Sequence, residues 1–118
     1  MDEIVEGGSF LFDYPLWYIS TTSKLVSEGV ITGFTGTGDR YAYVFTDEGF
    51  ARRFLEELPQ LSHCQPTPLK TPDEFVIFLD LMEAANCTYV GIDGRLSGTR
   101  CYGIREVRRR TTRSYVEA

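Results

Sequence analysis

The stretch that decides the fold spans residues 71–93 and reads TPDEFVIFLDLMEAANCTYVGID. Its start has the form of a capping box: the Thr71 hydroxyl can accept a hydrogen bond from the Glu74 amide, while the Glu74 carboxylate reaches back to the Thr71 amide. Pro72 takes the first helical position, where its missing N–H costs nothing. Apolar residues then recur at helical spacing, and β-type residues fill 88–92. The stretch therefore predicts a capped helix followed by a strand.

The helix predicted over residues 71–85 has an apolar surface wider than a single stripe. Its main row comprises Phe75, Phe78, Leu79, Met82 and Ala85, and the residues that widen it are Val76, Ile77 and Leu81. A helix with such a surface is expected to be buried on two sides. We expect a sheet on one side and either the C-terminal tail or a second subunit on the other.

The first half of the chain predicts strands joined by a hairpin. Aromatic and β-branched residues at 16–19 indicate a first strand. An extended piece that starts at residues 30–32 and a strand at 41–45 flank the turn residues 35–39. Because glycine supplies positive φ in such a turn, this pattern predicts a β-hairpin with a long loop.

A second helix is predicted directly after this hairpin. Thr46 can cap it, the acidic residues that follow suit its positive end, and Pro59 ends it. Its polar face holds two arginines, 52 and 53, spaced i,i+4 from two glutamates. A short strand near residues 62–65 is expected at a sheet edge, because prolines follow it.

The element order predicts an α+β fold: a two-layer sandwich, with a mixed β-sheet and two main helices on one face. Residues 1–118 are expected to form a single domain. Within it we expect a loose N-terminal segment at 1–14, an α+β core at 15–94 and an Arg-rich C-terminal segment at 95–118. The β-branched pair Thr111–Thr112 disfavours a long helix in that last segment.

The net charge of −5 is unevenly distributed along the chain. Residues 1–94 carry a balance of −10, whereas residues 95–118 carry seven arginines and a balance of +5. Since phosphate repels an acidic body, the composition argues against a general nucleic-acid binder. The basic tail can dock on its own acidic body, bind an acidic partner, or touch nucleic acid as an arm.

Composition also indicates the cellular setting. Three cysteines without paired spacing favour a reducing cytoplasm over a disulfide framework. No apolar run approaches the roughly 20 residues that span a bilayer, so no membrane partner is expected. The acidic start of the chain is unlike a secretory signal.

One segment resembles a known family. Residues 43–54, YVFTDEGFARRF, place an acidic helix start after a strand that ends in Phe-Thr. In this respect they resemble the N-terminal domain of the SseB (enhanced-serine-sensitivity) family. Residues 15–18 are similar to the first strand of that family and residues 75–92 to its second half, so the resemblance covers residues 15–94. It implies a fold rather than a reaction, and no catalytic residue is carried over.

No catalytic, cofactor or metal site is predicted, although several residues have the chemistry that such a site needs. Gly33–Gly38 precedes a strand rather than a helix, which favours a hairpin over a phosphate loop. His63 and Cys64 are neighbours on a strand and point to opposite faces, whereas His63 with another cysteine stays open as a dyad. A zinc site lacks Cys-x-x-Cys spacing.

The enzyme alternative is a small hydrolase or transferase with a strand-end pocket. In open sheets ligands favour the carboxyl ends of strands, where Asp47 and Asp93 are expected. Cys87 is the third candidate for such a pocket. The simpler interpretation is that these carboxylates, together with Glu48, Asp73 and Glu74, serve helix starts and a turn.

The preferred function is a non-enzymatic protein-interaction or regulatory module that binds a protein partner or itself. Strand alternation places Tyr41 and Tyr43 on the face opposite Ala42 and Val44, which suit a helix-covered face. Tyrosines on an open face suit an interface, because the ring is apolar and the terminal hydroxyl can contact water. The predicted partner-binding residues are Trp17, Tyr41, Tyr43, Tyr89, Arg105, Arg108 and Arg109. A nucleic-acid-associated accessory protein is the weakest alternative.

Overall fold

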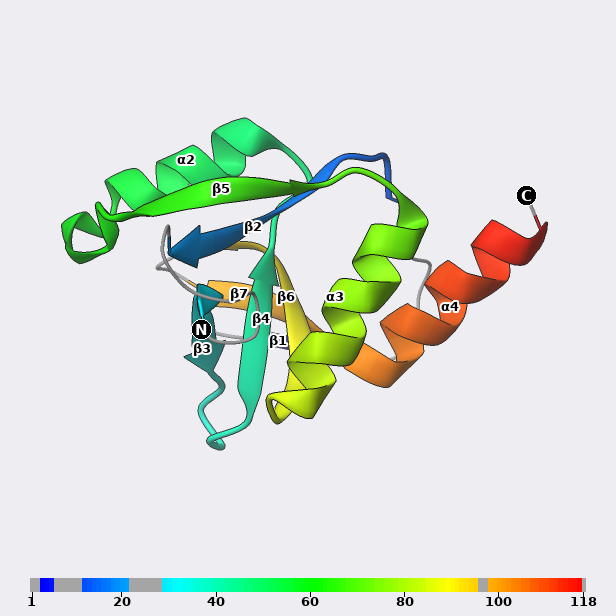
Figure 1. Ribbon diagram of the computed structural model, residues 1–118. Helices are drawn as coiled ribbons and strands as arrows, with labels where there is room; N and C mark the ends of the chain where they lie inside the picture. The colour runs from blue at the N-terminus through cyan, green and yellow to red at the C-terminus, as the bar shows by residue number, and fades with distance from the viewer. Residues whose placement is uncertain (1–2, 6–11, 22–28, 96–97, 118) are drawn as a thin grey trace.

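The computed structural model describes residues 3–5, 12–21, 29–95 and 98–117 (Figure 1). In this part of the chain, five strands form a mixed sheet in the order β1-β7-β6-β4-β3, and β2 and β5 form an antiparallel pair. The strands are β1 (Glu3–Val5), β2 (Leu16–Thr21), β3 (Thr32–Phe34), β4 (Arg40–Val44), β5 (Cys64–Leu69), β6 (Cys87–Arg95) and β7 (Gly98–Gly103). The helices are α2 (Glu48–Glu56), α3 (Pro72–Ala84), α4 (Ile104–Glu117) and the 3₁₀ turn η1 (Pro59–Leu61). The predicted α+β class with a mixed sheet is confirmed.

The five-stranded sheet combines local hairpins with long-range parallel pairs. β3 and β4 form the predicted antiparallel hairpin, and β6 lies parallel to β4 after a crossover through α2, β5 and α3. β7 returns antiparallel to β6, and β1 adds to β7 in parallel. The carboxyl ends of β4 and β6 therefore lie at the same edge of the sheet, and the chain enters α2 directly after β4.

Among the described residues, three backbone hydrogen bonds tie β2 to the residues that flank β3 and β4. The Trp17 amide donates to the Phe45 carbonyl at 2.9 Å, and the Phe45 amide donates back to the Trp17 carbonyl at 2.7 Å. The Ile31 amide donates to the Ile19 carbonyl at 2.9 Å. β5 pairs with β2 at the margin of this arrangement, as expected for a strand that contains prolines.

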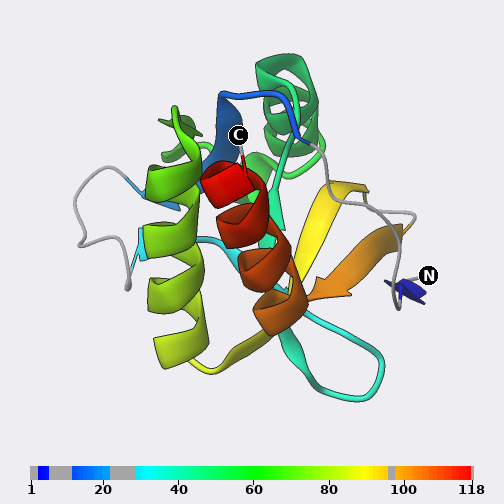
Figure 2. The ribbon, with the colours of Figure 1, turned by 90° about the vertical axis from the view of Figure 1, so that its right-hand side faces the viewer.

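α3 begins as predicted. The Thr71 hydroxyl accepts a hydrogen bond from the Glu74 amide at 3.2 Å, while the Glu74 carboxylate accepts from the Lys70 amide at 3.3 Å rather than from that of Thr71. The buried residues of α3 are Phe75, Phe78, Leu79 and Met82. Figure 2 shows α3 and α4 side by side over one face of the sheet, so the second cover of α3 is the C-terminal segment of its own chain.

The expectation that residues 95–118 lack a long helix is wrong. Residues 98–103 form β7 and residues 104–117 form α4. Ile104, Val107 and Thr111 lie on one side of this helix and are between 0% and 5% exposed. The low helix propensity of threonine amounts to only about 0.7 kcal/mol or less per residue, so the burial of this apolar stripe outweighs it.

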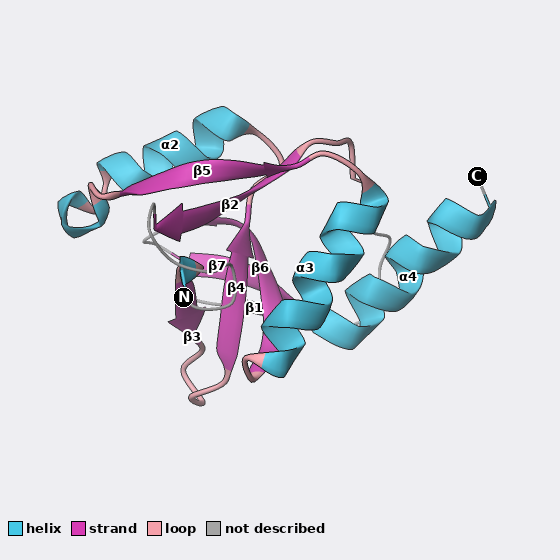
Figure 3. Cartoon of the chain, in the orientation of Figure 1, coloured by secondary structure: helices cyan, strands magenta, loops and turns pink. Residues whose placement is uncertain are grey.

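α2 differs from the prediction at its start and in its position. Its N-cap is Asp47 rather than Thr46, and the Asp47 carboxylate accepts from the Gly49 amide at 2.7 Å. Two helices share one face of the sheet, but they are α3 and α4. α2 instead lies beside β5 (Figure 3) and packs Phe54 against Tyr43, with ring centroids 4.6 Å apart.

Part of the first 14 residues is ordered structure rather than a loose end. Glu3–Val5 form β1, and two aromatic residues further along pack on α3. The rings of Phe12 and Tyr14 meet Phe75 edge-on, with centroids 6.0 Å and 6.4 Å away. These residues close one end of the main core.

Two hydrophobic clusters lie on opposite sides of β4. Ala42 and Val44 belong to the larger cluster, together with residues of α3 and α4. Tyr43 packs on the smaller cluster, which includes Phe45 of the loop after β4 and Phe54 of α2. The predicted alternation of β4 is therefore confirmed, but α2 approaches the tyrosine face.

Candidate functional site

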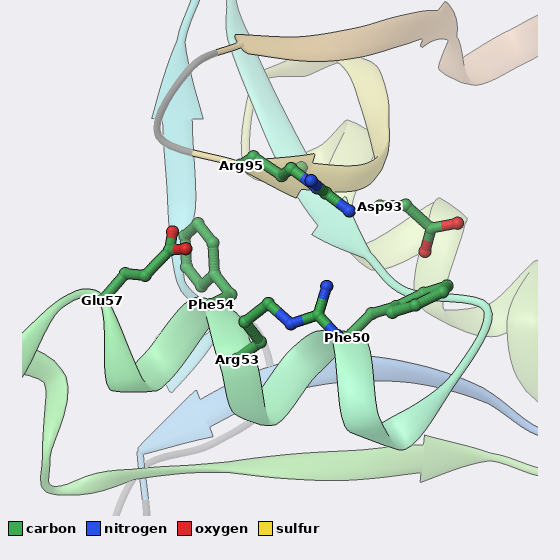
Figure 4. Close-up of a pocket in the computed structure, with 7 residues that line it drawn as sticks. Phe50, Arg53, Phe54, Glu57, Asp93 and Arg95 are labelled. Atoms are coloured by element: carbon green, nitrogen blue, oxygen red, sulfur yellow. The ribbon is translucent and has the colours of Figure 1, made fainter.

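A cleft of about 210 Å³ lies between α2 and the end of β6. α2 contributes Phe50, Arg53, Phe54 and Glu57, and β6 contributes Asp93, Gly94 and Arg95. We call it the α2–β6 cleft. Figure 4 shows Arg53 and Arg95 extending into it from opposite walls. It lies where the carboxyl ends of β4 and β6 come together, the edge where the sequence places Asp47 and Asp93.

Asp93 ties the two walls of the cleft together. Its carboxylate accepts hydrogen bonds from the Thr46 amide at 2.7 Å and from the Thr46 hydroxyl at 2.8 Å. Thr46 lies just before α2, so this contact fixes the start of the helix to the end of the strand. Asp93 adopts φ 51°, a left-handed conformation that aspartate tolerates better than most residues.

Gly94 lets the end of β6 lie close to the tyrosine face. A Cβ at this position would lie 2.8 Å from the Tyr43 ring and 2.8 Å from the Thr99 hydroxyl oxygen. Real Cβ atoms essentially never approach so closely, so a larger residue would push the strand away. The close contact brings Arg95, the next residue, onto the wall opposite α2.

The two arginines of the cleft have no acidic partner among the described residues. Neither guanidinium makes an ion pair or hydrogen bond with any residue that the structure describes. Arg53 instead lies over the Phe50 ring, with 5.8 Å between the guanidinium carbon and the ring centroid, and Phe50 is itself 40% exposed. The i,i+4 spacing of Arg53 and Glu57 therefore produces no ion pair, whereas Arg52 pairs with Glu48.

The three arginines predicted to bind a partner form ion pairs within the chain. Arg105 donates to the Glu83 carboxylate at 2.6 Å, and Arg108 donates to Glu83 and to Asp80 at 2.5 Å and 2.9 Å. These contacts hold α4 on α3 and lower the pKa of Glu83. Arg109 donates to Glu106 on its own helix at 2.8 Å. Self-docking is one of the alternatives that the sequence leaves open for the tail.

The predicted aromatic residues occupy different environments. Tyr41 is 3% exposed, and its hydroxyl lies 3.0 Å from that of Tyr43, so in this structure it supports the sheet rather than facing outward. Tyr43 and Trp17 are half-buried beside the smaller cluster. Tyr89 is half-buried at a broad depression of about 690 Å³ between β6, α3 and the start of α4.

The predicted aromatic and arginine residues do not form one surface. Trp17 and Tyr43 pack on the smaller cluster, whereas α4 packs on the larger cluster across β4. Their role in partner binding stays a prediction for the residues that are exposed or half-buried.

The candidate catalytic residues have structural surroundings. Asp47 caps α2, and Asp93 directs both oxygens at Thr46. Cys87 is 3% exposed, and burial raises the pKa of its thiol, which disfavours the nucleophilic thiolate. His63 is exposed while the cysteines are buried, so the described residues form no Cys–His dyad.

The other sites that were weighed also have simple structural explanations. Gly33–Gly38 belongs to the β3–β4 hairpin, in which the Gly38 amide donates to the Thr35 carbonyl at 3.0 Å. In the described part of the chain, no three residues of metal-ligating type gather as a metal ion would require.

The sequence places Asp47 and Asp93 at the edge of the sheet where the α2–β6 cleft lies, but it does not bring Arg53 and Arg95 together there. Asp93 at a strand end was the available signal, and Arg95 two residues later was counted only as part of the basic tail. The sequence places Arg53 on the polar face of its helix, and Arg53 is indeed exposed, but its i,i+4 spacing from Glu57 suggests a pair that does not form. The missing information is tertiary: the packing of Phe54 on Tyr43 and the hydrogen bonds from Thr46 to Asp93 place α2 opposite β6.

Comparisons with known proteins assign no function to this site. The sequence matches no model of a known protein family, and no curated protein matches it. The resemblance to the SseB family stays a prediction. None of the described helices combines the length and apolar character needed to cross a bilayer.

Proposed function

We propose that the protein is a non-enzymatic interaction module that binds a protein partner or a second copy of itself through the surface around the α2–β6 cleft. The observation that carries the proposal is the combination of an exposed aromatic ring, Phe50, with two arginines that lack acidic partners among the described residues. Aromatic and arginine side chains are the types most enriched among residues that dominate binding energy at protein interfaces.

The size of the cleft supports a binding role over an enzymatic one. Pockets for small molecules and cofactors usually enclose about 300–1,000 Å³. The α2–β6 cleft, at about 210 Å³, is smaller than this range and suits one or two side chains of a partner. The small hydrolase or transferase remains an alternative, because the depression of about 690 Å³ that Cys87 lines falls within this range. However, the Cys87 thiol is buried with a raised pKa, and the Asp47 and Asp93 carboxylates accept hydrogen bonds from Gly49 and Thr46. The nucleic-acid alternative is opposed by the balance of −10 over residues 1–94.

Two measurements test this proposal. Sedimentation across a wide concentration range tests self-association, and selection of random displayed peptides on the immobilised protein tests partner binding. We expect either self-association or enrichment of a peptide class, and Phe50→Ala weakens whichever is found. Ile77→Ala is the matched control, because Ile77 is exposed on α3 and does not line the cleft. The proposal would be contradicted if the protein is a monomer at every concentration and enriches no peptide more than the unfolded protein does.

A further inference from the structure

We propose that the α2–β6 cleft binds a carboxylate carried by an acidic segment of the partner, with Arg53 and Arg95 as its ligands. This inference rests on the proposed function and names the chemistry that the partner presents. It goes beyond the shape of the cleft, because it assigns a charge and two specific donors.

The first argument is electrostatic. Arg53 and Arg95 extend into the same narrow cleft from opposite walls (Figure 4), and neither is paired with an acid in the described residues. Glu57 and Asp93 also line the cleft, but neither pairs with an arginine among the described residues. The two guanidiniums that face the gap repel each other, and a carboxylate between them converts this repulsion into two attractions. Guanidinium groups also match carboxylate geometry better than any other side chain, because their donors form a planar fork.

The second argument is the position of Phe50. Its ring holds the Arg53 guanidinium at 5.8 Å, which restricts the arginine without using any of its N–H donors. Less conformational freedom is then lost when an anion binds. Phe50 is 40% exposed, and this apolar surface can contact the residue next to the bound acid. The ligand is therefore an acidic residue with an apolar neighbour.

The charge of the surroundings selects a carboxylate over a phosphate. Two carboxylates line the same cleft: the exposed Glu57, one helical turn from Arg53, and Asp93, which accepts from Thr46. Both oppose a doubly charged group more than a singly charged one. The acidic body repels an extended polyanion such as a nucleic acid. A single carboxylate on a peptide satisfies both arginines with the smallest repulsion.

Two sources of the carboxylate are separable with short peptides. The probes are Ac-Ala-Leu-Glu-Ala-amide, which carries only a side-chain carboxylate, and Ac-Ala-Leu-Gln-Ala acid, which carries only a terminal one. Ac-Ala-Leu-Gln-Ala-amide carries neither, and inorganic phosphate serves as the competing anion. Titrations of the full chain are followed through the NMR signals of the Arg53 and Arg95 side-chain N–H groups. We expect saturable shifts with the glutamate peptide or the terminal acid, and none with the neutral peptide.

Variants identify the cleft as the site. Arg53→Gln and Arg95→Gln are each expected to lower the affinity for the tighter-binding carboxylate peptide by about tenfold. This is the loss typical of one charge-assisted hydrogen bond. The matched control is Arg52→Gln. Arg52 neighbours Arg53 on α2, pairs with Glu48 at 2.8 Å and does not line the cleft, so its loss leaves the affinity unchanged.

Several results would overturn the inference. The neutral peptide could bind as tightly as the carboxylate peptides, or phosphate could bind more tightly than both. It could also be that no probe shifts the signals at concentrations up to ~10 mM, which is above the range of weak contacts. Finally, Arg52→Gln could lose as much affinity as Arg53→Gln. If the chain binds a partner or itself by the tests above while both cleft variants leave that binding intact, the proposed function stands and this inference fails.

Discussion

The contact between Asp93 and Thr46 is expected to stabilise the whole fold, because it joins the end of β6 to the start of α2. Asp93→Ala removes two short hydrogen bonds to a charged acceptor, at 2.7 Å and 2.8 Å. Such bonds contribute about 1.5–3 kcal/mol each, and the partial burial here favours the lower value. Alanine also tolerates the left-handed φ of 51° less well. We therefore expect the free energy of unfolding to fall by about 3 kcal/mol, a large part of the 5–15 kcal/mol typical of a domain.

Urea denaturation followed by circular dichroism measures this loss, and two further variants assign it to the contact. Asp93→Asn keeps the shape, an acceptor oxygen and tolerance of positive φ, so we expect a loss of only about 1 kcal/mol. Thr46→Val removes the hydroxyl donor but not the amide. Combined with Asp93→Ala it should be less than additive, by about 1 kcal/mol, because the hydroxyl bond is already lost. A loss below about 0.5 kcal/mol for Asp93→Ala, or full additivity, would refute the reasoning.

Three further predictions test the rest of the structure. Val107→Ala should lower the free energy of unfolding by about 2 kcal/mol in urea titrations, since Val107 is fully buried where α4 packs, whereas the exposed Arg109→Ala should change it by under about 1 kcal/mol; equal effects would contradict the docked helix. Cys87, like the other two cysteines, should react with Ellman's reagent only after unfolding, because it is buried and the pKa of its thiol is raised. Immediate reaction of Cys87 with the reagent in the native protein would instead favour the enzyme alternative. The lowered pKa of Glu83 stabilises the fold above the unfolded value of 4.5, and this contribution is lost as pH falls through the lowered folded pKa; Glu83→Gln should therefore make the acid-induced fall of the urea midpoint shallower, and an unchanged pH profile would argue against the pairing with Arg108.

The sequence predicted the elements whose signals are local. The start of α3 follows from the Thr71 cap with Pro72, and the β3–β4 hairpin follows from the glycines between two β-type runs. The start of α2 was misplaced by one residue, because Thr46 and Asp47 are both good caps. The choice between them depends on Asp93, 47 residues along the chain, because its carboxylate accepts the hydrogen bond that the Thr46 hydroxyl donates.

The elements that were missed depend on long-range contacts. β1 forms because β7 offers it an edge about 97 positions along the chain, as in the pair of Glu3 with Arg100. No local pattern over three residues indicates such pairing. α4 was missed for another reason: its Thr111–Thr112 pair was judged by propensity, while the stripe of Ile104, Val107 and Thr111 that packs under α3 was not counted. An amphipathic spacing of three and four residues was the better guide.

The charge distribution shows why a count along the chain differs from the charge that the folded protein presents. Residues 95–118 carry the excess of arginine, so the sequence assigned partner binding to that segment. In the folded chain, acids from α3 and from α4 itself pair with several of those arginines. Glu83, for example, accepts hydrogen bonds from both Arg105 and Arg108. The attraction available to a partner depends on the charge left after such internal pairing, not on the formal charge of a segment. By that measure our proposal turns to Arg53, which comes from an acidic region, and to Arg95, which lies at the very start of the basic one. Exchanging Arg108 should therefore affect stability more than binding, and exchanging Arg53 should do the reverse.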